Sequence, residues 1–120
     1  MIIEALACIA ISKALVLDKI EYYSQEMGAY PAMVDFIIRN ESTYNNCAVG
    51  DGHITGHDKP SLGLAQINLF HNPSVSPEEA LDPDFAIKYL INDLRAGKIS
   101  KWTTGRMFKK LYPNHPYFNG

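Results

Sequence analysis

The residue best suited to acid–base chemistry is Glu41, which ends an apolar helical run. It lies seven residues after Val34, four after Ile37 and three after Ile38, so the four side chains share one helix face. Burial and the partial negative charge of a helix C-terminus both raise the pKa of a carboxyl group. An acid that keeps its proton near neutral pH can protonate a leaving oxygen, so Glu41 is a candidate general acid. The alternative is an acid that turns outward at a frayed helix end.

Two helices must position this carboxyl group. Apolar residues recur at three- and four-residue steps over residues 2–27, which predicts one long amphipathic helix. Gly28 fits just past its end, and Pro31 fits the first turn of the next helix, which should run to about Asn40. The apolar N-terminal stretch has no basic segment before it and is too short to span a bilayer. We therefore interpret it as a core helix, with no export signal and no membrane span.

The rest of the chain also has helix signals. Residues 45–60 are rich in turn formers and predict a loop. Three further helices are expected, with starts at Ser76, at Asp82 and at Thr103 or Thr104, the last of them ending before Pro113. There is no internal repeat, no linker and no convincing strand alternation. Residues 1–120 are therefore expected to form a single all-α domain of five to six helices.

Charge is unevenly distributed along the chain. Hydrophobic residues make up 47% and charged residues 20%, a globular composition that excludes the disordered class. All 13 acidic residues lie at or before Asp93, and the basic residues after it are Arg95, Lys98, Lys101, Arg106, Lys109 and Lys110. This basic segment is either a solvated face or a surface attracted to an anionic polymer or to substrate carboxylates. No nucleic-acid motif accompanies it, so no nucleic-acid partner is expected.

Cysteine and histidine give weaker signals. Cys8 and Cys47 are compatible with one disulfide in an exported protein, or with two free buried thiols. His53 and His57 lie between two aspartates in a Gly-rich loop. Because that loop has no rigid element to fix ligand geometry, we expect solvent-exposed histidines and no metal site. No cofactor is implied either.

A longer pattern begins at Glu41. The chain reads Glu41-Ser42-x-Tyr44-Asn45, then Ala48-Val49, then Ser61-x-Gly63-Leu64-x-Gln66-Ile67-Asn68. This resembles the signature of the lysozyme-like lytic transglycosylases. The preceding helix, glycine turn and proline, and later Leu81-Asp82-Pro83, Gly97 and Trp102, also agree with that family, so the resemblance covers roughly residues 20–104. The spacing between Glu-Ser and the Gly-Leu-x-Gln-Ile block makes it fairly specific.

The resemblance implies a lysozyme-like fold around a catalytic groove. It implies cleavage of the β-1,4 bond between N-acetylmuramic acid and N-acetylglucosamine in peptidoglycan, with Glu41 as general acid and then base. These enzymes typically lack a nucleophilic carboxylate: the N-acetyl group can stabilise the oxocarbenium-like state, and the muramyl C6 hydroxyl attacks to give a 1,6-anhydro product, unlike the common two-carboxylate scheme. The implied substrate-binding residues are Ser42, Tyr44, Ser61, Gly63, Gln66, Asn68, Tyr89 and Trp102.

The resemblance also implies individual roles. Ser61 would hydrogen-bond near the N-acetyl group, and Gln66 would support Glu41 or the sugar. Gly63 would leave room for the glycan beside the backbone. Tyr44 would stack on a sugar ring, or it is simply a core aromatic.

The chain departs from the family in two places. The late Ala-Tyr-Asn-x-Gly block is missing, and Tyr89 or Tyr112 could replace its tyrosine. The loop after Val49 is long and brings Asp51 and Asp58; goose-type lysozymes, which share the fold, use such aspartates to position a water. Hydrolysis is therefore an alternative to transglycosylation. A non-catalytic glycan-binding or assembly module is a third, although an unused buried acid costs stability.

The expected partner is the peptidoglycan glycan strand, bound by a monomer. The expected place of action is the bacterial cell wall, periplasmic or extracellular.

Overall fold

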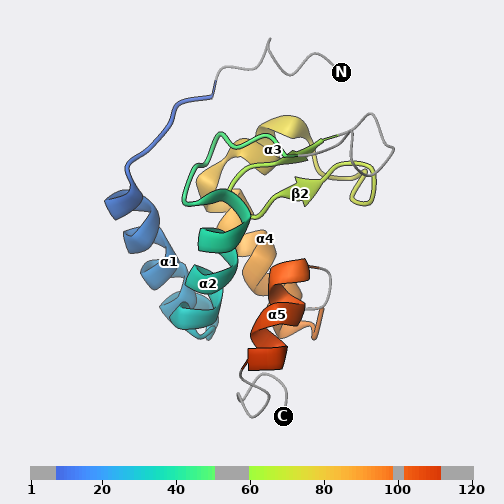
Figure 1. Cartoon of the computed structure of the whole chain (residues 1–120). Helices are drawn as coiled ribbons and strands as arrows, with labels where there is room; N and C mark the ends of the chain where they lie inside the picture. The colour runs from blue at the N-terminus through green and yellow to red at the C-terminus, as the bar shows by residue number, and fades with distance from the viewer. Residues whose placement is uncertain (1–7, 51–59, 99–101, 112–120) are drawn as a thin grey trace.

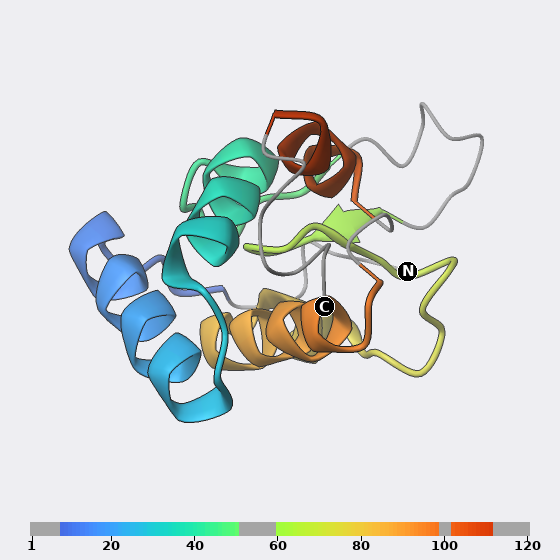
Figure 2. The ribbon, with the colours of Figure 1, turned by 90° about the horizontal axis from the view of Figure 1, so that it is seen from below.

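Helix α2 lies at the centre of the fold. The computed structural model describes residues 8–50, 60–98 and 102–111. In it, α2 (Pro31–Ser42) packs between α1 (Lys13–Met27) and α5 (Thr103–Leu111), as Figure 1 and Figure 2 show. The long α4 (Pro83–Arg95) packs on α1 and α2, and the short α3 (Pro77–Leu81) leads into it. The described part of the chain is thus mostly helical, with α2 contacting three of the other helices.

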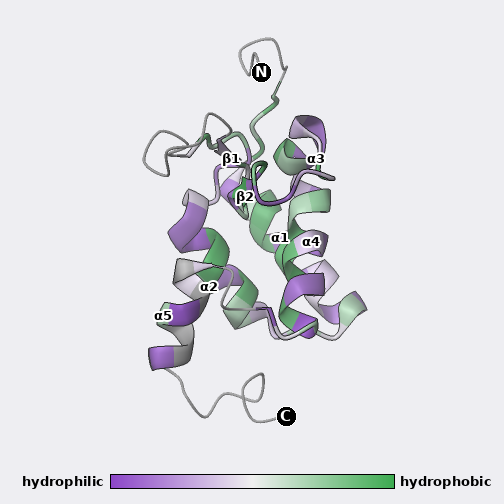
Figure 3. Ribbon diagram, turned by 90° about the vertical axis from the view of Figure 1, so that its right-hand side faces the viewer, coloured by the Kyte–Doolittle hydropathy of each residue, from purple (hydrophilic) through white to green (hydrophobic). Residues whose placement is uncertain are grey.

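One hydrophobic core joins these helices to a β-hairpin. Its largest fully buried side chains come from α2, from the hairpin and from α4: Met33, Ile37, Ile38, Leu62, Leu64, Ile67, Ile87, Leu90 and Ile91. Figure 3 shows the hydrophobic faces of the helices turned toward one another and the hydrophilic faces turned outward. The apolar periodicity that predicted α2 and α4 therefore corresponds to real buried faces.

The hairpin corrects the expectation of an all-α domain. Strand β1 (Ser61–Leu62) pairs antiparallel with β2 (Ile67–Asn68), and Val49 forms an isolated antiparallel bridge with Leu62. Gly63 and Gln66 adopt left-handed backbone conformations with φ of 79° and 50°, which close the turn. Strands of two residues are too short to show alternation, so the sequence pattern missed them.

The first helix is shorter than predicted. It begins at Lys13, where the Ser12 side chain accepts a hydrogen bond from the backbone N–H of Leu15 at 3.1 Å. Residues 8–12 are not helical, and Ile9 is 82% exposed, so the apolar periodicity of this stretch does not reflect burial. Its backbone instead bonds to a side chain from another segment, described below.

The other helix boundaries agree with their sequence signals. Gly28 caps α1 in a left-handed conformation, and α2 begins with Pro31 but runs two residues past Asn40. The capping box at Ser76 starts α3 and the Asp82 side chain caps α4. Among the described helices, none combines the length and apolar character needed to span a bilayer.

Candidate functional site

Glu41 lies in the last turn of α2 and is half-buried. Burial raises the pKa of its carboxyl group above the ordinary value of 4.5. None of the described residues donates a hydrogen bond to this carboxylate or forms an ion pair with it. The nearby Arg39 is exposed, and its guanidinium lies 5.6 Å from the centre of the Phe36 ring. The pKa of Glu41 is therefore raised in the expected direction, and burial is the cause; none of the described basic side chains pairs with the carboxylate to oppose it.

The backbone reverses sharply after Glu41. Thr43 and Tyr44 both adopt left-handed conformations, with φ of 51° and 63°. Such conformations are uncommon for residues with a side chain, and least favourable for a β-branched one. The reversal ends the helix directly after the carboxyl group and leads the chain toward the hairpin, which lies beyond the C-terminal end of α2 (Figure 1). Strained backbone of this kind is concentrated at functional sites.

Ser42 and Tyr44, two predicted substrate-binding residues, are buried. The Ser42 hydroxyl donates to the backbone oxygen of Ile38 at 3.0 Å. The Tyr44 side chain is 9% exposed, and its hydroxyl donates to Asp35 at 2.7 Å. The ammonium group of Lys13 lies 5.0 Å from the centre of the Tyr44 ring. These contacts favour the core-aromatic alternative for Tyr44 over sugar stacking.

Gly63 and Gln66 shape the turn of the hairpin. A Cβ atom added to Gly63 would collide with the backbone oxygen of Ala80 in α3, so glycine is needed here for packing as well as for its positive φ. The amide nitrogen of Gln66 donates to the backbone oxygens of Gly63 at 3.0 Å and Ala48 at 3.3 Å. Both amide protons of Gln66 are therefore used within the fold, and its side-chain oxygen lies against Gly50, where an added Cβ would collide with it.

Ser61 and Asn68 face each other across the hairpin. They are paired in the strand register, and the Asn68 amide donates to the Ser61 hydroxyl oxygen at 3.3 Å. The side-chain oxygen of Asn68 accepts from the backbone N–H groups of Phe70 and His71 at 2.9 and 3.1 Å. Both residues are partly exposed. Among the predicted substrate-binding residues, Ser61 and Asn68 are thus a pair of polar side chains on the hairpin that solvent can reach.

Tyr89 and Trp102 both hold loops to helices. The Tyr89 hydroxyl donates to the side-chain oxygen of Asn72, and its ring stacks on Phe85 with centroids 6.0 Å apart. Trp102 is 6% exposed, and its indole N–H donates to the backbone oxygen of Ala65 at 2.7 Å. Trp102 thus attaches the start of α5 to the hairpin, whereas Tyr89 attaches α4 to the segment after β2.

Three predicted residues fall outside the described part of the chain. Asp51 and Asp58, the possible water-positioning residues, are among them, as is Tyr112. Within the described residues, no group of three or more histidine, cysteine or acidic side chains is arranged to hold a metal ion. The described basic residues of the C-terminal segment are exposed, namely Arg95, Lys98, Arg106 and Lys110.

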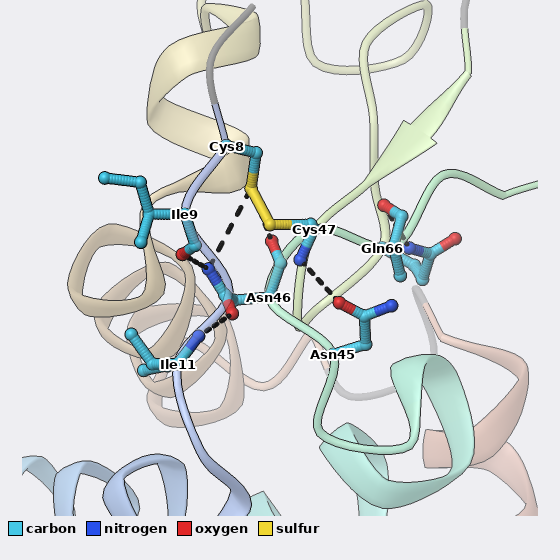
Figure 4. Close-up of a disulfide and its surroundings, with 8 residues drawn as sticks. Cys8, Ile9, Ile11, Asn45, Asn46, Cys47 and Gln66 are labelled. Atoms are coloured by element: carbon cyan, nitrogen blue, oxygen red, sulfur yellow. Dashed lines mark hydrogen bonds between the residues drawn. A yellow bond between two sulfur atoms is a disulfide. The ribbon is translucent and has the colours of Figure 1, made fainter.

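A covalent link joins the N-terminal segment to the segment that follows α2. Cys8 and Cys47 form a disulfide with 5.9 Å between their Cα atoms, so the free-thiol alternative is wrong. Beside it, the buried Asn46 side chain pairs with the backbone of the N-terminal segment, donating to Ile9 O at 3.0 Å and accepting from Ile11 N at 2.9 Å (Figure 4). Sequence reasoning missed Asn46 because a lone asparagine after a helix looks like a turn former.

No protein-family model, curated protein or solved structure matches the chain. A functional assignment therefore has to stand on the residues and contacts of this chain.

Proposed function

We propose that this protein is a peptidoglycan-cleaving glycosidase of lysozyme-like fold that acts as a lytic transglycosylase. The observation that carries the proposal is the state of Glu41: a half-buried carboxyl group at a helix end, with a raised pKa and no described partner. A structural carboxylate would normally be paired or hydrogen-bonded. One with a raised pKa and no partner among the described residues suits proton donation to a glycosidic oxygen.

In the proposed reaction, Glu41 protonates the oxygen of the β-1,4 bond while the bond to the muramyl C1 breaks. The N-acetyl group of the substrate stabilises the positive charge that develops at that carbon. The carboxylate of Glu41 then removes the proton of the muramyl C6 hydroxyl as its oxygen bonds to C1. The products are a 1,6-anhydro end and a free sugar hydroxyl, and Glu41 regains its proton. One carboxyl group is sufficient for these reaction steps, because Glu41 acts first as the acid and then as the base.

The hairpin is the proposed binding wall for the glycan. Ser61 and Asn68 are partly exposed polar residues there. Gln66, which lies between them in the sequence, is also partly exposed and donates two hydrogen bonds from its amide nitrogen to the backbone. The buried Ser42, Tyr44 and Trp102 would then support this wall from inside instead of contacting the sugar. The disulfide supports a place of action outside a reducing cytosol, at the bacterial cell wall.

The test is a product analysis. Purified protein is incubated with peptidoglycan, and the soluble fragments are analysed by mass spectrometry. Anhydro ends support the proposal, whereas reducing ends identify a hydrolytic lysozyme. Intact glycan with measurable binding identifies a non-catalytic module and refutes the proposed activity.

Two variants locate the chemistry. Glu41→Gln keeps the shape of the side chain but cannot exchange the proton, so cleavage should disappear. Glu26→Gln, at an exposed position on α1, is the matched control and should cleave normally. Activity retained in Glu41→Gln contradicts the assignment of Glu41.

A further inference from the structure

The connecting segment, residues 46–50, contacts two parts of the molecule at once. On one side it holds the N-terminal strap, residues 8–11, through the disulfide and through the two hydrogen bonds of Asn46. On the other side it continues into the hairpin. Figure 4 shows Ile9 and Ile11 on one side of the segment and Gln66 on the other.

The hairpin side is held by backbone hydrogen bonds. Ala48 O accepts from Gly63 N at 2.8 Å and also from the Gln66 amide, and Gly50 N donates to Ser61 O at 2.7 Å. On the connecting segment, the acceptor Ala48 O and the donor Gly50 N therefore both lie within three residues of Cys47. A shift of Cys47 changes the position of Ala48, which is its neighbour in the chain and the main acceptor for the hairpin turn.

We propose that the Cys8–Cys47 disulfide is a redox latch that sets the geometry of the hairpin, and through it the glycan-binding wall of the proposed function, on which this second part rests. When the bond is intact, the strap fixes the connecting segment and the segment fixes the turn at Gly63 and Gln66. When it is broken, the strap is held by the hydrogen bond that Asn46 donates to Ile9 and the one that it accepts from Ile11, and the connecting segment gains freedom.

The redox step needs a thiol reagent, for which a small dithiol is the probe. Two electrons and two protons pass from the dithiol to the two cysteine sulfur atoms; the Cys8–Cys47 bond breaks, and the reagent closes to its own disulfide. Access is available because both cysteines are half-buried rather than enclosed, and Cys8 lines a surface cavity of about 300 Å³. The acidic residues Glu78 and Asp82 line the same cavity. They should repel negatively charged reagents, so a dithiol whose attacking thiolate carries a single negative charge is preferred as the probe to glutathione, which also carries carboxylates.

The test compares amide NMR spectra of the oxidised and dithiol-reduced protein. Amide chemical shifts report the folded state, so they separate a local change from a loss of overall stability. We expect the Gly50, Gly63 and Gln66 amide signals to move or broaden on reduction. Signals from the interior of α4, such as Ala86 and Leu90, should stay in place because that helix has no described bond to the connecting segment.

The double variant Cys8→Ser/Cys47→Ser is the matched control. It should give the reduced spectrum without any dithiol and should not respond to the reagent. Changes confined to the strap and to residues 45–48 would overturn the latch, because the hairpin would then be independent of the disulfide. Loss of signal dispersion in α4 as well would also overturn it, because the bond would then be a general staple of the fold.

Activity on peptidoglycan separates this inference from the proposed function. Cleavage that falls by about tenfold or more in the reduced protein, in step with the Gly63 signal, supports both, since a site loosened by a small displacement loses about that much or more. Unchanged cleavage with a shifted Gly63 signal overturns the link to the glycan-binding wall. Absence of cleavage in both forms with a shifted Gly63 signal refutes the proposed function and leaves the latch supported.

Discussion

Two carboxyl groups at helix ends show opposite electrostatic environments. Asp84, at the start of α4, accepts from the ammonium group of Lys19 at 2.9 Å and from the Tyr23 hydroxyl at 2.8 Å. The hydrogen bond from Lys19 is the main cause that lowers the pKa of Asp84. Glu41, at the end of α2, has no such partner among the described residues, and burial raises its pKa. One carboxyl group is held ionised and the other is favoured in its protonated form.

The difference separates the structural role of Asp84 from the chemical role proposed for Glu41. Asp84 joins α1 to α4, and its negative charge also lies near the favourable N-terminal end of the α4 dipole. Glu41 joins nothing that the structure describes and lies at the unfavourable end of its helix. An acid in that position lowers stability at neutral pH, which is the pattern expected of a residue kept for its reactivity.

The largest expected effect is on cleavage. Glu41→Gln should lower the rate of peptidoglycan cleavage by about 100-fold or more, the usual contribution of a general acid. Asp84→Asn should leave the rate within about twofold, because Asp84 acts in packing α1 on α4. Fragment release measured by mass spectrometry under identical conditions checks the pair. Equal losses of cleavage rate in the two variants would contradict the assignment of a chemical role to Glu41 and a structural role to Asp84.

Next in size is the stability lost with Asp84. Asp84→Asn should lower the free energy of unfolding at pH 7 by about 1 kcal/mol, a modest value because water screens a side chain that is 38% exposed. Since its folded pKa is lowered from 3.8, its contribution is present above that pH and is lost as pH falls through the folded pKa. Urea denaturation of both proteins from neutral to strongly acidic pH measures this. A difference that persists unchanged in acid would contradict the ionic origin.

Urea denaturation of Glu41→Gln should show a gain in the free energy of unfolding at neutral pH, where Asp84→Asn shows a loss. The folded state keeps the Glu41 proton above pH 4.5 whereas the unfolded state releases it, so wild-type stability falls as pH rises from 4.5 through the folded pKa. The glutamine variant lacks this fall and should be more stable than wild type at pH 7. The gain should vanish below pH 4.5. A variant that is less stable than wild type at neutral pH would show that Glu41 has a structural partner.

The smallest expected effect is at Tyr23. The hydrogen bond to Asp84 is the main cause that raises the pKa of the Tyr23 hydroxyl to about 12. Tyr23→Phe should cost about 0.5 kcal/mol at pH 7. Between pH 10, the ordinary tyrosine pKa, and about 12, the unfolded state releases the Tyr23 proton while the folded state keeps it, so the free energy of unfolding falls as pH rises. Tyr23→Phe should lack this fall. Thermal unfolding followed across that range tests it, and identical alkaline profiles for the two proteins would rule out the coupling.

Much of the helical frame was predictable from local signals. The capping residues at Ser76 and Asp82, the Gly28 end signal and the apolar face that contains Glu41 are all properties of residues within one helical turn. Such signals do not depend on the rest of the fold. The location of Glu41 at a half-buried helix end was therefore predictable, and so was the direction of its pKa change.

The failures involve contacts between distant residues. The start of α1 was predicted too early because apolar spacing at residues 2–12 suggested burial, whereas Ile9 is exposed and the strap bonds to Asn46 across 37 residues. The hairpin was missed because its two-residue strands are specified by the turn and by the bridge to Val49. The substrate-binding roles of Ser42 and Trp102 stay predictions; the structure adds that both residues donate hydrogen bonds to backbone oxygens, which sequence alone does not reveal.

The disulfide has a consequence for biosynthesis. It encloses α1 and α2 in a covalent loop, and both of its sulfur atoms lie within the first 47 residues of the sequence. During synthesis or passage through a membrane, the N-terminal part of a chain emerges first. The bond can therefore close before β1, β2 and α4 have been released. The segments on either side of α1 and α2 can thus be joined before the hairpin has folded.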